Sequence, residues 1–267
     1  MKKQETSAFS NTKIAIVFFV FLIFFVVLSL IFKIVLVVRA GQFDDSKRFN
    51  LYISDNKNLE VISLSGGTKN ISIFKLNKNI KSEEAGRFLE IPIDGFILSS
   101  SLNLDQKINS LFLSSILNYS KLQTNLTFID LFKFLLFSRT VADSSINIRN
   151  ISENLDPLEL DKAVGRLVSD ELIEKDNQTI QIINGTQVGG LGNRLARLIT
   201  NMGGDVIIVA TSDAPRKKST ISYIDKKTYT VERLSKVLGY EIIKENKSAI
   251  SDITIVIGED KVSSSPF

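Results

Sequence analysis

The most prominent pattern in the chain is an apolar run near its N-terminus. From Ile14 to Val38 the residues are apolar except for Ser29 and Lys33. A helix of about 20 apolar residues is long enough to cross a bilayer, and its apolarity on all sides is not typical of a soluble helix. A cleaved signal peptide has a shorter apolar region and a small-residue cleavage site, which does not follow this run. The pattern therefore predicts an uncleaved transmembrane anchor, within a first segment of residues 1–40.

The orientation of this anchor follows less directly from the charges around it. Basic residues stand on both sides of the run, so the count of flanking positive charges is nearly balanced. A short N-terminal tail and a large C-terminal part favour an N-terminus in the cytoplasm. We therefore expect a single-pass protein of the cell membrane with an extracytoplasmic C-terminal part, and the opposite orientation stays open.

Residues 44–150 show a mixture of strand and helix patterns. Two β-rich runs, residues 59–64 and 71–76, flank Ser65-Gly66-Gly67-Thr68 and predict a hairpin. Residues 91–98 form a further extended apolar run that contains a turn signal. The two strand-forming runs and the later helical patterns predict a mixed α/β region.

Two helices are expected in this region, at residues 105–122 and 127–141. The second is apolar almost all round, but it contains Asp130 and Lys133 and is too short to span a bilayer. We expect a buried core helix. A membrane-surface or partner-binding helix is the alternative, and an exposed apolar face on residues 128–137 would favour it.

The C-terminal third of the chain has the most regular pattern. Asp156-Pro157-Leu158-Glu159 is a strong helix start and predicts a linker helix, within residues 151–177, that runs to about Glu174. The order β-α-β-β-α-β-β then predicts a small α+β domain at residues 178–260, of the split βαβ type with its helices on one face, and a tail at 261–267. The whole chain is thus predicted to be α+β. The expected strands are residues 180–184, 206–210, 219–224, 241–243 and 253–258, and the expected helices are residues 190–202 and 230–238.

Composition narrows the possible chemistry. The 267 residues include no cysteine, histidine or tryptophan. This excludes disulfides, thiolate or imidazole metal ligands, and Ser-His-Asp triads. We predict no metal and no cofactor. The net charge of +4 is mild and the lysines are spread along the chain, which argues against a nucleic-acid partner.

A glycine-rich loop joins the strand at residues 180–184 to the following helix. It lacks the third glycine of the dinucleotide fingerprint, because Leu195 stands there, and it has no Walker A lysine. The glycines can simply make a tight turn, or they can let a ligand approach, because a helix N-terminus can hold an anion. Both hypotheses stay open. The candidate ligand-binding residues are Asn184, Gly185, Thr186, Gly189, Gly190 and Arg194.

A basic triplet, Arg216-Lys217-Lys218, lies in the polar loop before the strand at 219–224. It is either a solvated face or a contact for anionic wall polymer or lipid headgroups. Arg194 and Arg197, on the helix after the glycine loop, are either solubilising or ligand-binding residues.

The C-terminal pattern carries a resemblance to a known family. Ile183-Asn184-Gly185-Thr186, Gly190-Leu191, Gly204-Asp205-Val206 and the closing residues 252–260, DITIVIGED, resemble the LytR_C domain. Gly192 replaces the alanine that is usual in that family. LytR_C is the C-terminal module of some LytR-CpsA-Psr cell-envelope proteins, so the resemblance implies a bacterial cell-envelope protein.

The middle region resembles the LytR-CpsA-Psr catalytic domain more faintly. Ile91-Pro92-Ile93-Asp94-Gly95-Phe96 is similar to the family's I-P-I-D-Y-Y, but Leu76-Asn77-Lys78-Asn79 stands where the family has Pro-Arg-Asp. Lysine cannot form the bidentate fork of arginine, and asparagine lacks the charge of a carboxylate. We therefore expect a degenerate, non-catalytic relative of a glycopolymer phosphotransferase.

These observations together favour a membrane-anchored extracytoplasmic accessory protein that binds cell-wall polymer or another envelope protein. The main alternative is a divergent phosphotransferase, which would require Arg87, Arg139 and Arg149 to converge on Asp94. A structural partner of a membrane complex is a third hypothesis.

Overall fold

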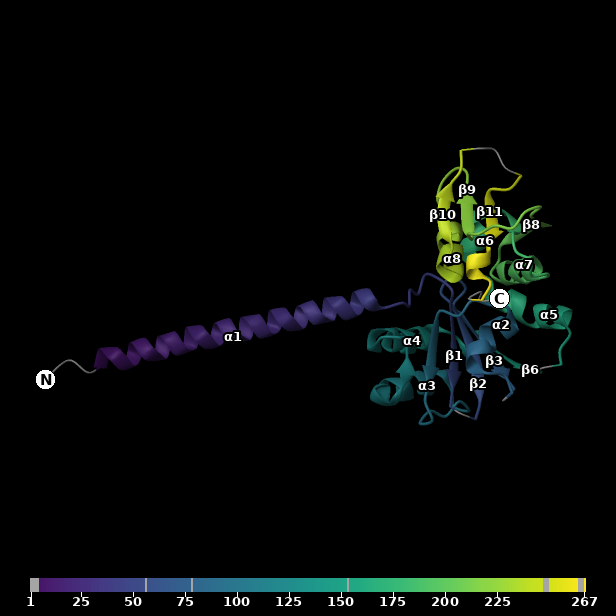
Figure 1. Cartoon of the computed structure of the whole chain (residues 1–267). Coiled ribbons are helices and arrows are strands. Elements are labelled where there is room, and N and C mark those ends of the chain that lie inside the picture. Colours follow the sequence, from purple (N-terminus) through teal and green to yellow (C-terminus); the bar gives the residue numbers. More distant parts are fainter. Residues whose placement is uncertain (1–4, 56, 78, 153, 247–249, 264–266) are drawn as a thin grey trace. The chain divides into compact units, whose positions relative to one another are not determined.

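The chain folds into two compact units, Met1–Gln42 and Phe43–Phe267 (Figure 1). The computed structural model describes residues 5–55, 57–77, 79–152, 154–246, 250–263 and 267.

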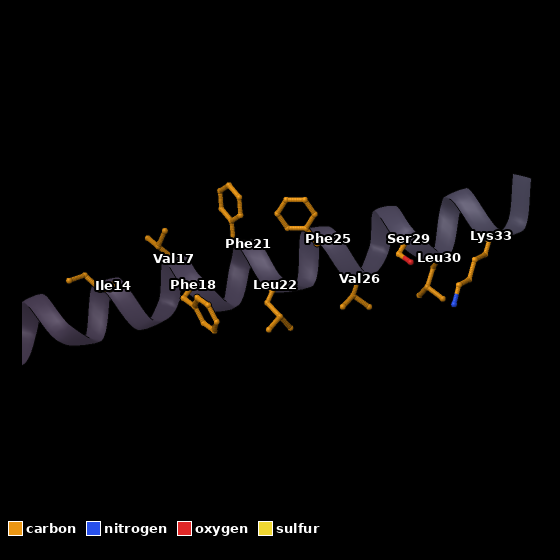
Figure 2. Close-up of a pocket in the computed structure, with 10 residues that line it drawn as sticks. All are labelled: Ile14, Val17, Phe18, Phe21, Leu22, Phe25, Val26, Ser29, Leu30 and Lys33. Atoms are coloured by element: carbon orange, nitrogen blue, oxygen red, sulfur yellow. The ribbon is translucent and has the colours of Figure 1, made fainter.

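The first unit is a single long helix, α1 (Glu5–Ala40). The segment Lys13–Ala40 is long and apolar enough to cross a membrane. Its most apolar stretch has a mean hydropathy of 3.4, and none of the residues in that stretch is buried. Figure 2 shows side chains of α1 alone, from Ile14 to Lys33. The helix is therefore compatible with the predicted membrane anchor, because lipid would supply the apolar surroundings that these side chains lack.

The second unit begins with a six-stranded mixed sheet of order β5-β4-β1-β2-β3-β6. The hairpin expected around Gly66-Gly67 is confirmed, since β2 and β3 pair antiparallel with Leu64 opposite Ile71. The parallel pairs are β1 with β4 and β3 with β6. The strand bounds are β1 (Phe49–Ser54), β2 (Leu59–Ser65), β3 (Asn70–Leu76), β4 (Gly95–Leu98), β5 (Gln123–Thr124) and β6 (Ile146–Ile151).

Helices cover both faces of this sheet (Figure 1). Alternate strand residues point to opposite faces, so Ile62 and Leu64 pack with α3 and α4 while Val61 packs with α2 and α5. This three-layer packing explains why β2 is buried along its whole length. The helix bounds are α2 (Ala85–Leu89), α3 (Ile108–Leu117), α4 (Phe128–Thr140) and α5 (Pro157–Val168), with short 3₁₀ turns at Ser82–Glu84, Tyr119–Lys121 and Asp143–Ser145.

Helix α4 is the apolar helix that the sequence predicts as part of the core. Thr127 and Asp130 form a reciprocal capping box at its start. Asp130 also accepts a hydrogen bond from the backbone N–H of Phe43 at 3.0 Å. Phe134 is fully buried on one side of α4, whereas Phe132 is 48% exposed on the other. The helix is therefore a core helix on one side only.

The linker differs from the single helix that we predict up to Glu174. It consists of α5 and a separate α6 (Glu171–Asp176), with Ser169 and Asp170 in extended conformations between them. Asp170 caps α6 by accepting from the N–H of Leu172, and its own N–H donates to Met202 O at 2.9 Å. The helical run is interrupted there because the backbone N–H of Asp170 donates to Met202 and not to a carbonyl of α5. Among the described residues, the side chain of Asp156 does not form the expected capping hydrogen bond at the start of α5.

The C-terminal sheet has the order β10-β9-β11-β7-β8, and its elements follow the predicted β-α-β-β-α-β-β sequence. Two parallel pairs, β7 with β8 and β9 with β10, flank β11, which is parallel to β7 and antiparallel to β9. Ile180 and Ile182 face the core beneath α7 and α8, while Gln181 and Ile183 point to the opposite face and are partly exposed. The bounds are β7 (Thr179–Asn184), α7 (Leu191–Asn201), β8 (Asp205–Thr211), β9 (Thr220–Tyr223), α8 (Tyr229–Leu238), β10 (Glu241–Lys244) and β11 (Ile253–Ile257), followed by a 3₁₀ turn at Glu259–Lys261.

One buried carboxylate in the first sheet makes stability depend on pH. Glu60 on β2 is 3% exposed and pairs with Lys75 at 3.1 Å. Burial raises the pKa of Glu60 above its ordinary 4.5, and Lys75 offsets this only in part. Because the folded-state pKa is the higher one, the stability linked to this group is full below the unfolded pKa and is lost as pH rises through the folded value.

Glu60→Gln is therefore expected to gain stability relative to the parent protein as pH rises from about 4 to 7. The measurement is the urea unfolding free energy of a fragment of residues 41–267, which contains the whole second unit. Glu84→Gln, at an exposed position, is the control. A difference between Glu60→Gln and the parent that does not change with pH would contradict this account.

Candidate functional site

The loop between β7 and α7 is held in shape by its own side chains. Asn184 donates from Nδ2 to Val188 O at 2.9 Å and accepts from both the N–H and the hydroxyl of Thr186. The Thr186 hydroxyl in turn accepts from the N–H of Val188 at 3.2 Å. Both side chains are buried, so their polar atoms shape the loop, and a ligand would have to compete with these bonds.

Two glycines of this loop stand where a residue with a side chain would be strained or would clash. Gly190 has φ +82° at the start of α7, a conformation that residues with a side chain rarely adopt. A Cβ on Gly185 would lie 2.5 Å from Arg216 Cγ and 2.9 Å from Ile257 O. Gly189, in contrast, has open space around it. The structural role of the glycines is therefore clear at Gly185 and Gly190, and Gly189 lies where the loop surface is open.

The glycine loop and the basic triplet lie side by side. Arg216 N–H donates to Gly185 O at 2.7 Å, and Gly185 N–H donates to Ile257 O at 2.9 Å. Arg216, Lys217 and Lys218 are exposed, as is Arg194 in the first turn of α7. Two features that the sequence presents 30 residues apart thus meet at one end of the sheet and place several cations near an open loop.

A second concave surface lies where α5 packs against α7, beside β8. It is a groove of about 850 Å³, and sequence reasoning alone did not identify it. Side chains of both charges, together with amide and hydroxyl groups, offer donors and acceptors along it. The lining residues are Asp161, Lys162, Gly165, Arg166, Ser169, Glu174, Ala196, Arg197, Thr200, Asn201, Gly203, Val206 and Val209.

A buried ion pair connects the loop before β4 to α8. Arg233 donates from Nη1 and Nη2 to the two carboxylate oxygens of Asp94, at 2.5 and 2.9 Å. The side chains are only 7% and 4% exposed. Burial alone would lower the pKa of Arg233, but the Asp94 carboxylate outweighs burial and raises it. The pair is bidentate, which is the geometry in which arginine binds carboxylates most strongly.

Further polar contacts surround this pair. Tyr229 donates to Asp170 at 2.7 Å, and burial together with the neighbouring carboxylate raises the pKa of the Tyr229 hydroxyl. Arg197 on α7 pairs with Glu90, and Asn201 donates to the carbonyl of Glu90 at 3.1 Å. Helices α7 and α8 are thus bonded, through Arg197, Asn201 and Arg233, to the segment that follows α2.

The arginines that a phosphotransferase would need do not gather at Asp94. Arg139 on α4 and Arg149 on β6 are exposed, and so is Arg87 on α2, while Asp94 is engaged by Arg233. Asn79 is exposed, and Lys78 lies outside the described residues. Among the described residues, no group of three or more acidic, histidine or cysteine side chains is placed to hold a metal ion.

The C-terminal part of the chain matches a known family. The model of that family, described as LytR cell envelope-related transcriptional attenuator, covers residues 177–260. These residues form a LytR_C domain. The matched residues contain the five-stranded sheet with α7 and α8, and so the glycine loop, the basic triplet and Arg233 all belong to the LytR_C domain. The match relates the protein to the cell envelope, as the resemblance in the sequence implies.

Three solved structures are similar to the chain at low identity. The transcriptional regulator yvhJ from Bacillus subtilis is 11% identical, with a TM-score of 0.32, over 40% of this chain and 83% of that one. The Lmo1026 protein from Listeria monocytogenes (9%, TM-score 0.27) covers 41% and 83%, and the Lin1025 protein from Listeria innocua (12%, TM-score 0.27) covers 40% and 82%. No curated protein matches the chain. The resemblance of the middle region to the LytR-CpsA-Psr catalytic domain stays a prediction.

Proposed function

We propose that this protein is a membrane-anchored cell-envelope accessory protein whose LytR_C domain binds cell-wall polymer or an envelope protein. The observation that carries the proposal is the adjacency of the open glycine loop and the exposed triplet Arg216-Lys217-Lys218, joined by the hydrogen bond from Arg216 to Gly185. Exposed cations beside the glycine loop favour an anionic ligand. Anionic wall polymer is therefore the ligand that we place first, with an acidic protein surface as the alternative.

The proposal places the second unit outside the cytoplasmic membrane. The proposed ligand requires this orientation, because wall polymer would be accessible only from the outer side.

We further propose that the middle region has no catalytic role. Asp94 stands in the segment that resembles the phosphotransferase family, and its carboxylate is buried against Arg233. A carboxylate that already binds a buried arginine on both oxygens, and the N–H of Asn50 as well, has little capacity left for a substrate or a metal.

The test is a pulldown of the 41–267 fragment on isolated wall, with and without its anionic polymer. The fragment starts before Phe43 because that residue belongs to the core. Changing Arg216, Lys217 and Lys218 together to glutamine is expected to weaken binding about tenfold, at about 0.5 kcal/mol per exposed charge.

The matched control removes three exposed lysines elsewhere in the LytR_C domain, Lys226, Lys236 and Lys244, and is expected to bind like the parent. An equal loss in both variants would show that only net charge matters. Binding that is unchanged after the anionic polymer is stripped would reject anionic polymer as the ligand.

A further inference from the structure

The exposed side of α4 is apolar and carries no acid. Phe128, Phe132 and Leu136 are 47%, 48% and 47% exposed and follow one another at intervals of four residues, so they form one strip along the helix. The only acid of α4, Asp130, is buried, and the exposed charge on the helix is Arg139. A surface helix of a soluble domain normally shows water a polar face, which this strip does not.

The residue that follows α1 most closely in the second unit, Phe43, is bonded to α4. Phe43 follows Ala40, the last residue of α1, by three positions, which an extended chain spans in about 10 Å. Phe43 is fixed to α4 at three points, because its N–H donates to Asp130, its carbonyl accepts from Lys133 at 3.1 Å, and its ring packs on Phe134 at 4.6 Å. Only three residues of chain therefore separate the end of α1 from a residue that is bonded to α4.

A small cleft beside the strip combines cations with apolar walls. It has a volume of about 310 Å³ and includes Leu136 and Phe137 on its apolar side. Lys69 and Lys133 also line it, together with Asp45 as the one carboxylate among the lining residues. Two ammonium groups next to an apolar surface suit a phosphate headgroup whose acyl chains lie against that surface.

We propose that the strip Phe128–Phe132–Leu136 docks α4 onto the bilayer that holds α1, with an anionic phospholipid headgroup in the cleft of Lys69 and Lys133. The proposal rests on α1 being a membrane anchor. The bilayer is the occupant that the observations favour, because Phe43, which is bonded to α4, follows the apolar helix by three residues, and because Lys69 and Lys133 line the cleft beside the strip. A protein partner would have no such reason to meet the strip at this position.

The experiment uses the full chain reconstituted into vesicles. Because the chain contains no tryptophan, Phe132→Trp introduces a single tryptophan into the strip, and its fluorescence can be excited apart from that of the tyrosines. The matched control is Ile148→Trp, which replaces another exposed apolar residue, on β6. Lipids brominated on their acyl chains quench a fluorophore that enters the bilayer, and vesicles with and without anionic phosphatidylglycerol test the cleft.

Phe132→Trp is expected to be quenched several-fold more strongly than Ile148→Trp, because an interfacial helix sinks roughly 5–10 Å below the headgroup level. Lys69→Asn in the Phe132→Trp background is expected to reduce the additional quenching that phosphatidylglycerol gives. Asparagine suits this position because Lys69 has φ +48°, a left-handed conformation that asparagine tolerates.

Flotation of the vesicles separates the possible failures. Protein that floats with the vesicles but shows equal, weak quenching in both variants would overturn docking while keeping the anchor, and the strip would then fit a protein partner. Protein that does not float would overturn the anchor and docking together, without bearing on wall binding by the LytR_C domain.

Discussion

Replacing Arg233 by methionine is expected to lower the free energy of unfolding of the second unit by about 3–5 kcal/mol. Methionine fills much of the space but leaves the Asp94 carboxylate buried without its partner, and the two side chains are only 7% and 4% exposed. An uncompensated buried charge has a large desolvation cost, whereas the pair itself contributes much less than its rupture suggests. Urea unfolding of the 41–267 fragment at pH 7 measures the loss.

Two variants test the explanation. Adding Asp94→Asn to Arg233→Met should recover much of the loss, because asparagine has no charge and can still accept from the N–H of Asn50, which now donates to Asp94 at 3.0 Å. Arg194→Met, at an exposed arginine of α7, should change stability by less than about 0.5 kcal/mol. If Arg233→Met cost no more than this control, water would have to reach the pair, contrary to its burial.

Phe134→Ala is expected to destabilise the second unit by about 3–5 kcal/mol. Phe134 is fully buried, and its ring lies 4.6 Å from that of Phe43, 5.3 Å from Phe112 and 5.4 Å from Phe49, measured between ring centres. Truncation removes these contacts and leaves a cavity that the surrounding elements can close only in part. The same urea unfolding measurement applies.

Phe132→Ala is the matched control, because it makes the same substitution two residues away on the same helix. With 48% of Phe132 exposed, the expected loss is below about 1 kcal/mol. This pair of variants also separates the two sides of α4, since Phe132→Ala should leave the fold intact and impair only the docking that we propose. Equal losses for both variants would mean that the exposed strip is part of the core.

Several features could be foreseen because they depend on local patterns. The apolar run of α1, the hairpin of β2 and β3, and the element order of the C-terminal part follow from periodicity and turn residues that lie within a few positions of one another. The resemblance of residues 183–192 and 252–260 to LytR_C is confirmed by the family match over residues 177–260.

Other features depend on partners that are far away in the sequence. The single linker helix that we predict is wrong, because Asp170 bonds to Met202 and Tyr229 and so ends the helical run near Ser169. Arg233 is not among the candidate residues that the sequence predicts, although the sequence contains a signal for it. It lies on the buried side of α8 with Val231 and Leu234, and a charged residue on an apolar helix face calls for a buried partner.

The sequence by itself determined the membrane-length helix, the α+β class and the LytR_C domain, because each rests on patterns that a short stretch of chain carries alone. Only the tertiary structure decided that the glycine loop meets the basic triplet, that Asp94 is held by Arg233, and that α4 is buried on one side and exposed on the other. The physical reason is that these properties depend on which surfaces are covered after packing. Contacts between residues such as Phe43 and Asp130, 87 positions apart, leave no periodic trace in the sequence.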